Sequence, residues 1–210
     1  MDKWDWSLSD TIGFSVKDTR ININDHLLPA SSTITRWNNL VPKKVNILVW
    51  RTLIDRIPTR YNLSNKGIDI PSILCPLCST DLETTNHLFL ACKIANKLWR
   101  LIATWLDIPT LLLATNLEDA LLLLDNMPIK VLKKNCIEAV LFCMIWVIWK
   151  HRNEQVFSSG QNRPDFLFDS IVSQSYLWAT SRSKKLRVSR DEWFKNPFSL
   201  YSGLLVVTRS

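Results

Sequence analysis

Apolar side chains recur at helical spacing in several stretches of the chain, and they predict a mainly α-helical fold. The first stretch runs from 36 to 66, and its apolar positions at i, i+3, i+4 and i+8 are Val45, Leu48, Val49 and Leu53. Pro42 suits the first turn of this helix, and Pro58 ends it because a residue before proline disfavours helical backbone angles. Thr59 is then the expected N-cap of a second, short helix.

Later stretches repeat the helical pattern, and the sequence predicts helices over 87–106, 111–124, 129–157 and 165–183. Apolar residues cover nearly all faces between 139 and 149, so we expect that part to be buried on most sides. The first 35 residues alternate loosely between apolar and polar, which indicates a short strand or an extended N-terminal arm. We also expect Arg51 and Asp55 to pair at i, i+4 on the exposed side of the first helix.

The amino-acid composition favours helices over hairpins and indicates which cellular compartment the protein occupies. Only 4 of the 210 residues are glycine, so tight hairpin turns and a phosphate-cradling loop are not expected. The longest uncharged apolar run spans 139–149, whereas a membrane span needs about 20 residues, so no membrane partner is expected. The 5 cysteines are an odd number without a secretory signal, which favours an intracellular, reducing compartment and metal binding over disulfides.

The clearest chemical motif is a set of four metal-type ligands, Cys75, Cys78, His87 and Cys92. Two cysteines separated by two residues bring both sulfurs onto one ion, and Cys3His is a known structural zinc set. The alternatives are unrelated surface cysteines, or a redox motif, which would need a strand before it and a helix directly after it. His87 and Cys92 are separated by about 500° on an ideal helix, roughly 140° off one face. We therefore expect a helix to start between them or to be distorted there.

The other cysteines and histidines give no comparable pattern. Cys136 and Cys143 share one face of an apolar helix and are expected in the core. His26 lies in a polar stretch, and no role is expected for it, whereas His151 lies in a basic run that is expected to be a solvated helix end. The chain has no Asp-x-Asp motif, no Gly-x-Ser-x-Gly and no Gly-rich loop, so no catalytic residues are assigned and the chain is not expected to be an enzyme.

Positive charge is concentrated in two segments. The net charge is +7, and residues 36–67 carry seven cations against one acid, 7 − 1 = +6. A second basic segment spans 182–190. Such clusters suit an anionic partner, usually RNA or DNA, although a merely soluble basic surface is the alternative. The candidate nucleic-acid contacts are Lys43, Lys44, Arg51, Arg56 and Arg60.

Many of these residues occur in the same order in a known family. The matching positions are Trp37, 41–51, 56–60, Leu63, 75–78, Glu83, Thr84, 87–92, Leu98 and Trp99. Over roughly 4–105 the chain resembles the zinc-binding domain that follows the polymerase in LINE-type, non-LTR retrotransposon reverse transcriptases, abundant in plants. The stretch 146–157 resembles the tail that often follows it. The resemblance implies one structural zinc on Cys75, Cys78, His87 and Cys92, and a nucleic-acid-associated role beside a polymerase that this chain lacks.

Together these observations predict three segments: a zinc-stapled module at 1–106, a helical region at 107–183, and a poorly ordered basic and aromatic tail at 184–210. The first hypothesis is a nucleic-acid-binding module in which zinc fixes the loop 71–92 against the helices. The second is a scaffold that docks on the polymerase portion of the parent element, with Trp193 and Phe194 exposed at the interface. A non-functional fragment of such an element is a further alternative.

Overall fold

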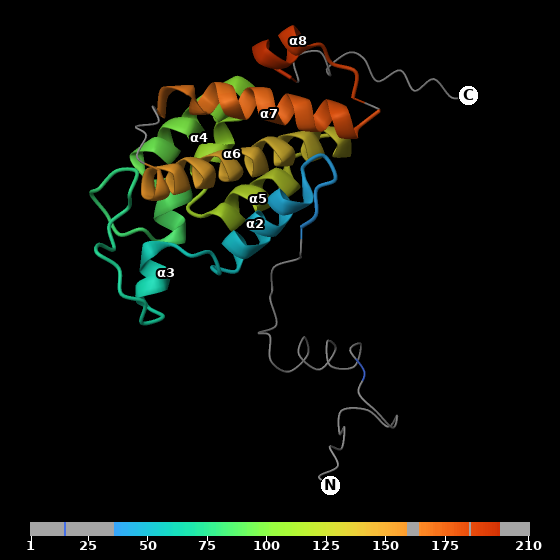
Figure 1. Ribbon diagram of the computed structural model, residues 1–210. Coiled ribbons are helices and arrows are strands. Elements are labelled where there is room, and N and C mark those ends of the chain that lie inside the picture. Colours follow the sequence, from blue (N-terminus) through green and yellow to red (C-terminus); the bar gives the residue numbers. More distant parts are fainter. Residues whose placement is uncertain (1–14, 16–35, 159–163, 185, 198–210) are drawn as a thin grey trace. The chain divides into compact units, whose positions relative to one another are not determined.

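The computed structural model describes residues 15, 36–158, 164–184 and 186–197 (Figure 1). The chain divides into two compact units, Met1–Thr35 and Arg36–Ser210. The expected extended arm at 1–35 lies outside the described residues, Ser15 apart, and so does His26. Within the described part of the second unit, helices dominate and the one isolated β-bridge pairs Leu74 with Leu82. The expected mainly α fold is confirmed.

The first two helices begin where the sequence predicts, but α2 ends at Leu53, before the end expected at Pro58. Helix α2 spans Lys43–Leu53 behind Pro42, and it buries one face, with Val45, Asn46, Leu48, Val49 and Thr52. Helix α3 spans Arg60–Ser64, and the Thr59 side chain accepts a hydrogen bond from the backbone N–H of Asn62.

The expected pair of Arg51 with Asp55 is wrong. Asp55 lies beyond the end of α2 with a positive φ of 51°, so it does not continue the helical surface. Its carboxylate accepts hydrogen bonds from Asn62 and Thr85, while Arg51 donates to the carbonyl of Arg56 at 2.9 Å. Asp55 therefore links α3 to the segment before His87.

The helical structure in the middle of the chain is interrupted at more points than the apolar pattern predicts. Helix α4 spans Lys93–Leu106, and a 3-10 turn, η3, spans Pro109–Leu113. Helix α5 begins only at Leu117 and runs to Asn126, so the single helix expected over 111–124 is wrong. The Asn116 side chain accepts from the Asp119 N–H and caps α5, which fixes its start after the 3-10 turn.

Helix α6, Val131–Phe157, forms the centre of the described core. It packs against α2, α4, α5 and α7 (Leu167–Arg182), and the central placement is visible in Figure 1. Nearly all side chains between 139 and 149 are buried, as the sequence predicts, and Cys136 and Cys143 lie in this core. A short 3-10 turn, η4 (Pro164–Phe166), precedes α7.

A last helix, α8 (Arg190–Lys195), lies against α7, within the segment expected to be a poorly ordered tail. Ser189 and Glu192 form a reciprocal capping box at its start. Trp193 is fully buried, with its ring beside Trp105 and Tyr176, so its expected exposure is wrong. Trp105 Nε1 also donates to the Trp193 carbonyl at 3.1 Å.

None of the helices in the described ranges is long and apolar enough to cross a membrane. The division of the chain at residues 106 and 183 stays a prediction.

Candidate metal centre

The first two cysteines lie on a tight turn that is closed by backbone hydrogen bonds. Cys75 N–H donates to the Asp81 carbonyl at 2.7 Å, and Ser79 N–H donates to the Cys75 carbonyl at 2.8 Å. Ser79 has a φ of 58°, in the left-handed region, and this reverses the chain after Cys78. The bridge between Leu74 and Leu82 holds both ends of the turn together. Both sulfurs therefore face the same side.

The distortion expected between His87 and Cys92 is a π-helical turn, η2, that spans His87–Ala91. Cys92 N–H donates to the His87 carbonyl at 2.7 Å, a hydrogen bond across five residues. Such a bond brings residues five apart onto one face, which a regular α-helix does not do. Cys92 is then extended, with ψ of 136°, and α4 begins after it. Of the two expected alternatives, the distortion is confirmed, whereas α4 begins only after Cys92 and not between the two ligands.

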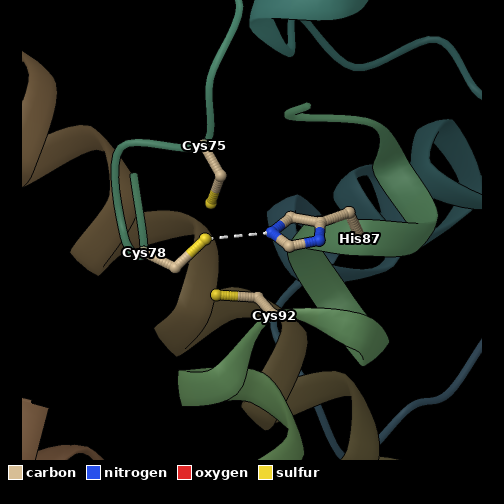
Figure 2. Close-up of side chains that lie close together, drawn as sticks. All are labelled: Cys75, Cys78, His87 and Cys92. Atoms are coloured by element: carbon tan, nitrogen blue, oxygen red, sulfur yellow. Dashed lines mark hydrogen bonds between the residues drawn. The ribbon is translucent and has the colours of Figure 1, made fainter. Parts of the chain in front are cut away.

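These two elements bring four ligand atoms together (Figure 2). The three sulfurs and a histidine nitrogen all lie within 4.8 Å of one another. Cys78 Sγ and His87 Nε2 are 3.2 Å apart, the cysteines are buried, and the His87 side chain is 11% exposed. Zinc bonds of about 2.3 Å to sulfur and about 2.0–2.1 Å to nitrogen give tetrahedral edges of about 3.6–3.8 Å. The donor set and its size suit one zinc ion.

Hydrogen bonds to the sulfurs of Cys78 and Cys92 stabilise the thiolate forms of these two cysteines. Burial alone would raise the pKa of Cys78, but hydrogen bonds from the Thr80 side chain and from backbone N–H groups lower it. Cys75 and Cys92 share a hydrogen bond, which raises the pKa of Cys75, together with burial, and lowers the pKa of Cys92. Zinc binds thiolates, so the cation would supply the attraction that ionises the remaining thiol.

Asp81 lies behind the histidine ligand. Its Oδ2 is 4.0 Å from His87 Nδ1, too far for a hydrogen bond but close enough to act through its charge. Carboxylates behind zinc-binding histidines commonly orient the ring and raise its basicity. With four protein ligands the tetrahedron is filled, so the zinc has a structural role and no open position for water.

Fold and ligand set define this part of the chain as a helical zinc-binding module. Residues 14–99 match the model of a protein family described as zinc-binding in reverse transcriptase, which confirms the expected reverse-transcriptase zinc-binding domain in this range. The match includes all four ligands and ends within α4. Neither the curated proteins nor the solved structures contain a match to this chain.

One residue of the zinc loop, Glu83, has a role that sequence reasoning missed. Its side chain is fully buried and forms a two-pronged ion pair with Arg152 of α6, at 2.6 Å to Nε and 2.8 Å to Nη2. Glu83 also accepts a hydrogen bond at 2.7 Å from the backbone N–H of Arg60, in the first turn of α3. The carboxylate therefore ties the loop between Cys78 and His87 to two helices, one of them beyond the matched segment.

The five predicted nucleic-acid contacts have different surroundings. Lys43, Lys44, Arg51 and Arg56 are exposed, and Lys44 lies 4.6 Å from the centre of the Trp146 ring. Arg60 is partly buried, and its guanidinium donates to the Leu74 carbonyl at 2.8 Å, so it also holds the zinc loop.

Arg36, counted in the same basic segment, is not a free charge. It pairs with Asp125 and with Glu138, the latter at 3.1 Å. The hydrogen bonds to these two carboxylates raise the pKa of the Arg36 guanidinium. The neighbouring Asn38 amide donates to Glu138 and to the Asn135 carbonyl. These contacts fasten the segment before α2 onto α6.

Proposed function

We propose that this chain is a nucleic-acid-binding module of a LINE-type retrotransposon reverse transcriptase, and that it acts by binding RNA or DNA without carrying a catalytic centre. The match of 14–99 to the zinc-binding family supports the association with reverse transcription. The closed Cys3His ligand set supports a structural use of the metal, because a catalytic zinc keeps one position open.

The observation that carries the proposal is the uncompensated charge of α2. The helix holds Lys43, Lys44 and Arg51 and no acidic residue, and all three side chains are exposed. The nearest acid along the chain, Asp55, is engaged by Asn62 and Thr85. Exposed cations without acidic neighbours suit a row of phosphates.

The charges also work against the helix that carries them. Lys43 and Lys44 occupy the first turn of α2, which has no acid and no side-chain cap. Cations at a helix start oppose the helix dipole, so they do not contribute to the stability of α2. Binding of an anionic partner explains why lysines occupy these two positions, whereas the stability of α2 does not explain it.

Titration of a labelled oligonucleotide at several salt concentrations tests the proposal. The affinity should fall steeply with salt, and Lys43→Ala and Arg51→Ala should each weaken binding and flatten the salt dependence by about 0.7–0.9 in slope. Lys195→Ala, at the exposed end of α8, serves as the matched control and should have little effect. Absence of binding at low salt, or binding that does not change with salt, would contradict the proposal.

A scaffold that docks on the polymerase is the second candidate, and one observation favours it. The surface near α2 also exposes large apolar side chains, Trp37, Ile47 and Trp50. Exposed aromatic groups are frequent at protein interfaces. Co-purification with the polymerase portion, lost on Trp50→Ala but insensitive to nucleic acid, would favour this candidate.

A further inference from the structure

The outward side of α2 combines aromatic and basic groups. We call the exposed side chains of this helix the α2 face; they are Lys43, Lys44, Ile47, Trp50 and Arg51. On a helix of 3.6 residues per turn, Lys43, Ile47 and Trp50 lie within about 60° of one another, and Arg51 and Lys44 flank them on one side. The α2 face is therefore one strip that has the large indole of Trp50 at one edge and cations beside it.

The indole of Trp50 remains open to solvent. Trp50 is 42% exposed and Ile47 is 48% exposed, although the opposite side of α2 is buried against α6. Within the described ranges the Trp50 indole has no hydrogen bond and no ring contact, whereas the backbone carbonyl of Trp50 accepts a hydrogen bond from the Ile54 N–H. Exposing a tryptophan ring costs free energy relative to burial, so its position is not explained by the packing of α2.

A second tryptophan is fastened beside the same helix. Trp37 is 53% exposed and directly precedes Asn38. The backbone of Asn38 exchanges two hydrogen bonds with the Asn46 side chain of α2, at 2.8 and 2.9 Å. Trp37 thus extends from a segment that α2 holds in place.

We infer that the α2 face binds single-stranded nucleic acid, with a base stacked on Trp50 and phosphates held by Lys43 and Arg51. This inference rests on the proposed function and specifies which strand form is bound. In a duplex the bases are stacked on one another, so an exposed indole has no base face to contact. In a single strand every base offers such a face, and a cationic neighbour fixes the phosphate beside it. The absence of acids from α2 favours this polyanion over a protein partner.

The test compares a single-stranded oligouridylate with a duplex RNA of equal length, by fluorescence anisotropy with the full chain. We expect Trp50→Ala to weaken binding of the single strand about tenfold and to leave the duplex affinity unchanged. Trp50→Phe should restore most of the affinity because it keeps an aromatic face. Trp50→Leu should behave like alanine, because it keeps apolar area without that face. Phe157→Ala, which truncates an exposed ring at the end of α6, is the matched control.

Salt dependence separates stacking from charge. The Trp50 variants should keep the wild-type slope of affinity against salt, whereas Lys43→Ala should lower it by about 0.7 for a single strand. Wild-type affinity of Trp50→Ala, full affinity of Trp50→Leu, or an equal loss for duplex and single strand would each overturn the inference, while leaving the proposed function intact. A wild-type protein that binds neither these RNAs nor single-stranded and duplex DNA of the same length would overturn the proposed function itself.

Discussion

Replacing Glu83 by alanine should cost the zinc-loaded protein about 3–5 kcal/mol of unfolding free energy, the typical cost of breaking a buried ion pair. The variant removes the two carboxylate oxygens that accept hydrogen bonds from Arg152, one of which also accepts from the Arg60 N–H. The two bonds to the guanidinium are charge-assisted and are worth about 1.5–3 kcal/mol each, which gives a similar sum. Arg152 would keep only the Pro58 carbonyl at 3.4 Å and the Asn153 side chain at 3.1 Å.

Urea unfolding in excess zinc, followed by tryptophan fluorescence, measures this cost. The double variant Glu83→Leu with Arg152→Met should lose much less than the sum of the two single losses, because it leaves no unpaired buried charge. Lys97→Ala is the control, since its ion pair with Asp165 is exposed at 3.8 Å and should contribute less than about 1 kcal/mol. A loss below about 1 kcal/mol for Glu83→Ala, or additive losses in the double variant, would refute the reasoning.

Other expected outcomes concern the C-terminal helices and the caps. Trp193→Ala should cost about 3–5 kcal/mol in the same urea assay and should speed proteolysis of α8, because the ring is fully buried against α7 and Trp105. Burial lowers the pKa of His151 below its unfolded value of 6.5, so near this pH the unfolded state binds a proton that the folded state does not. The free energy of unfolding should therefore fall as the pH drops below 6.5. His151→Gln should reduce that loss. Thr59→Ala should cost about 1 kcal/mol by removing the N-cap of α3, and Thr59→Ser should largely restore the lost stability. An unchanged urea midpoint would argue against the Trp193 and Thr59 predictions. For His151→Gln, a loss of stability at low pH equal to that of the wild type would argue against the prediction.

Local rules predicted the helices that have strong local signals. The i, i+3, i+4 spacing and Pro42 located the start of α2, and Thr59 located the start of α3. The angular mismatch between His87 and Cys92 indicated a helix start or a distortion between them, and the structure shows a π-helical turn. In each case the information lies within a few residues of sequence.

Two further helix starts carry local signals that the spacing of apolar residues does not show. Asn116 followed by Asp119 marks the start of α5, and Ser189 followed by Glu192 is a capping box that marks α8. The leucine-rich pattern over 111–124 indicated one continuous helix and so placed the start of α5 too early. The basic residues of 182–190 show no apolar periodicity, so α8 was not predicted.

The Glu83–Arg152 pair could not be found by such rules. The partners are 69 residues apart, and helical periodicity shows which face of α6 is buried but not which distant loop it meets. The same reason applies to Arg36, whose charge counted toward the basic segment although Asp125 and Glu138 neutralise it. Long-range pairing depends on the packing of whole helices, which a single sequence does not display.

The most direct test of the central claim is elemental analysis for metal in protein purified without chelator, with Cys78→Ser prepared in parallel. The account predicts one zinc ion per wild-type chain and loss of that zinc in the variant, because Cys78 provides one of the four ligands. The variant Cys136→Ser, which changes a buried thiol outside the cluster, should keep its zinc. A folded wild-type protein without zinc, or a Cys78→Ser variant that retains it, would contradict the account.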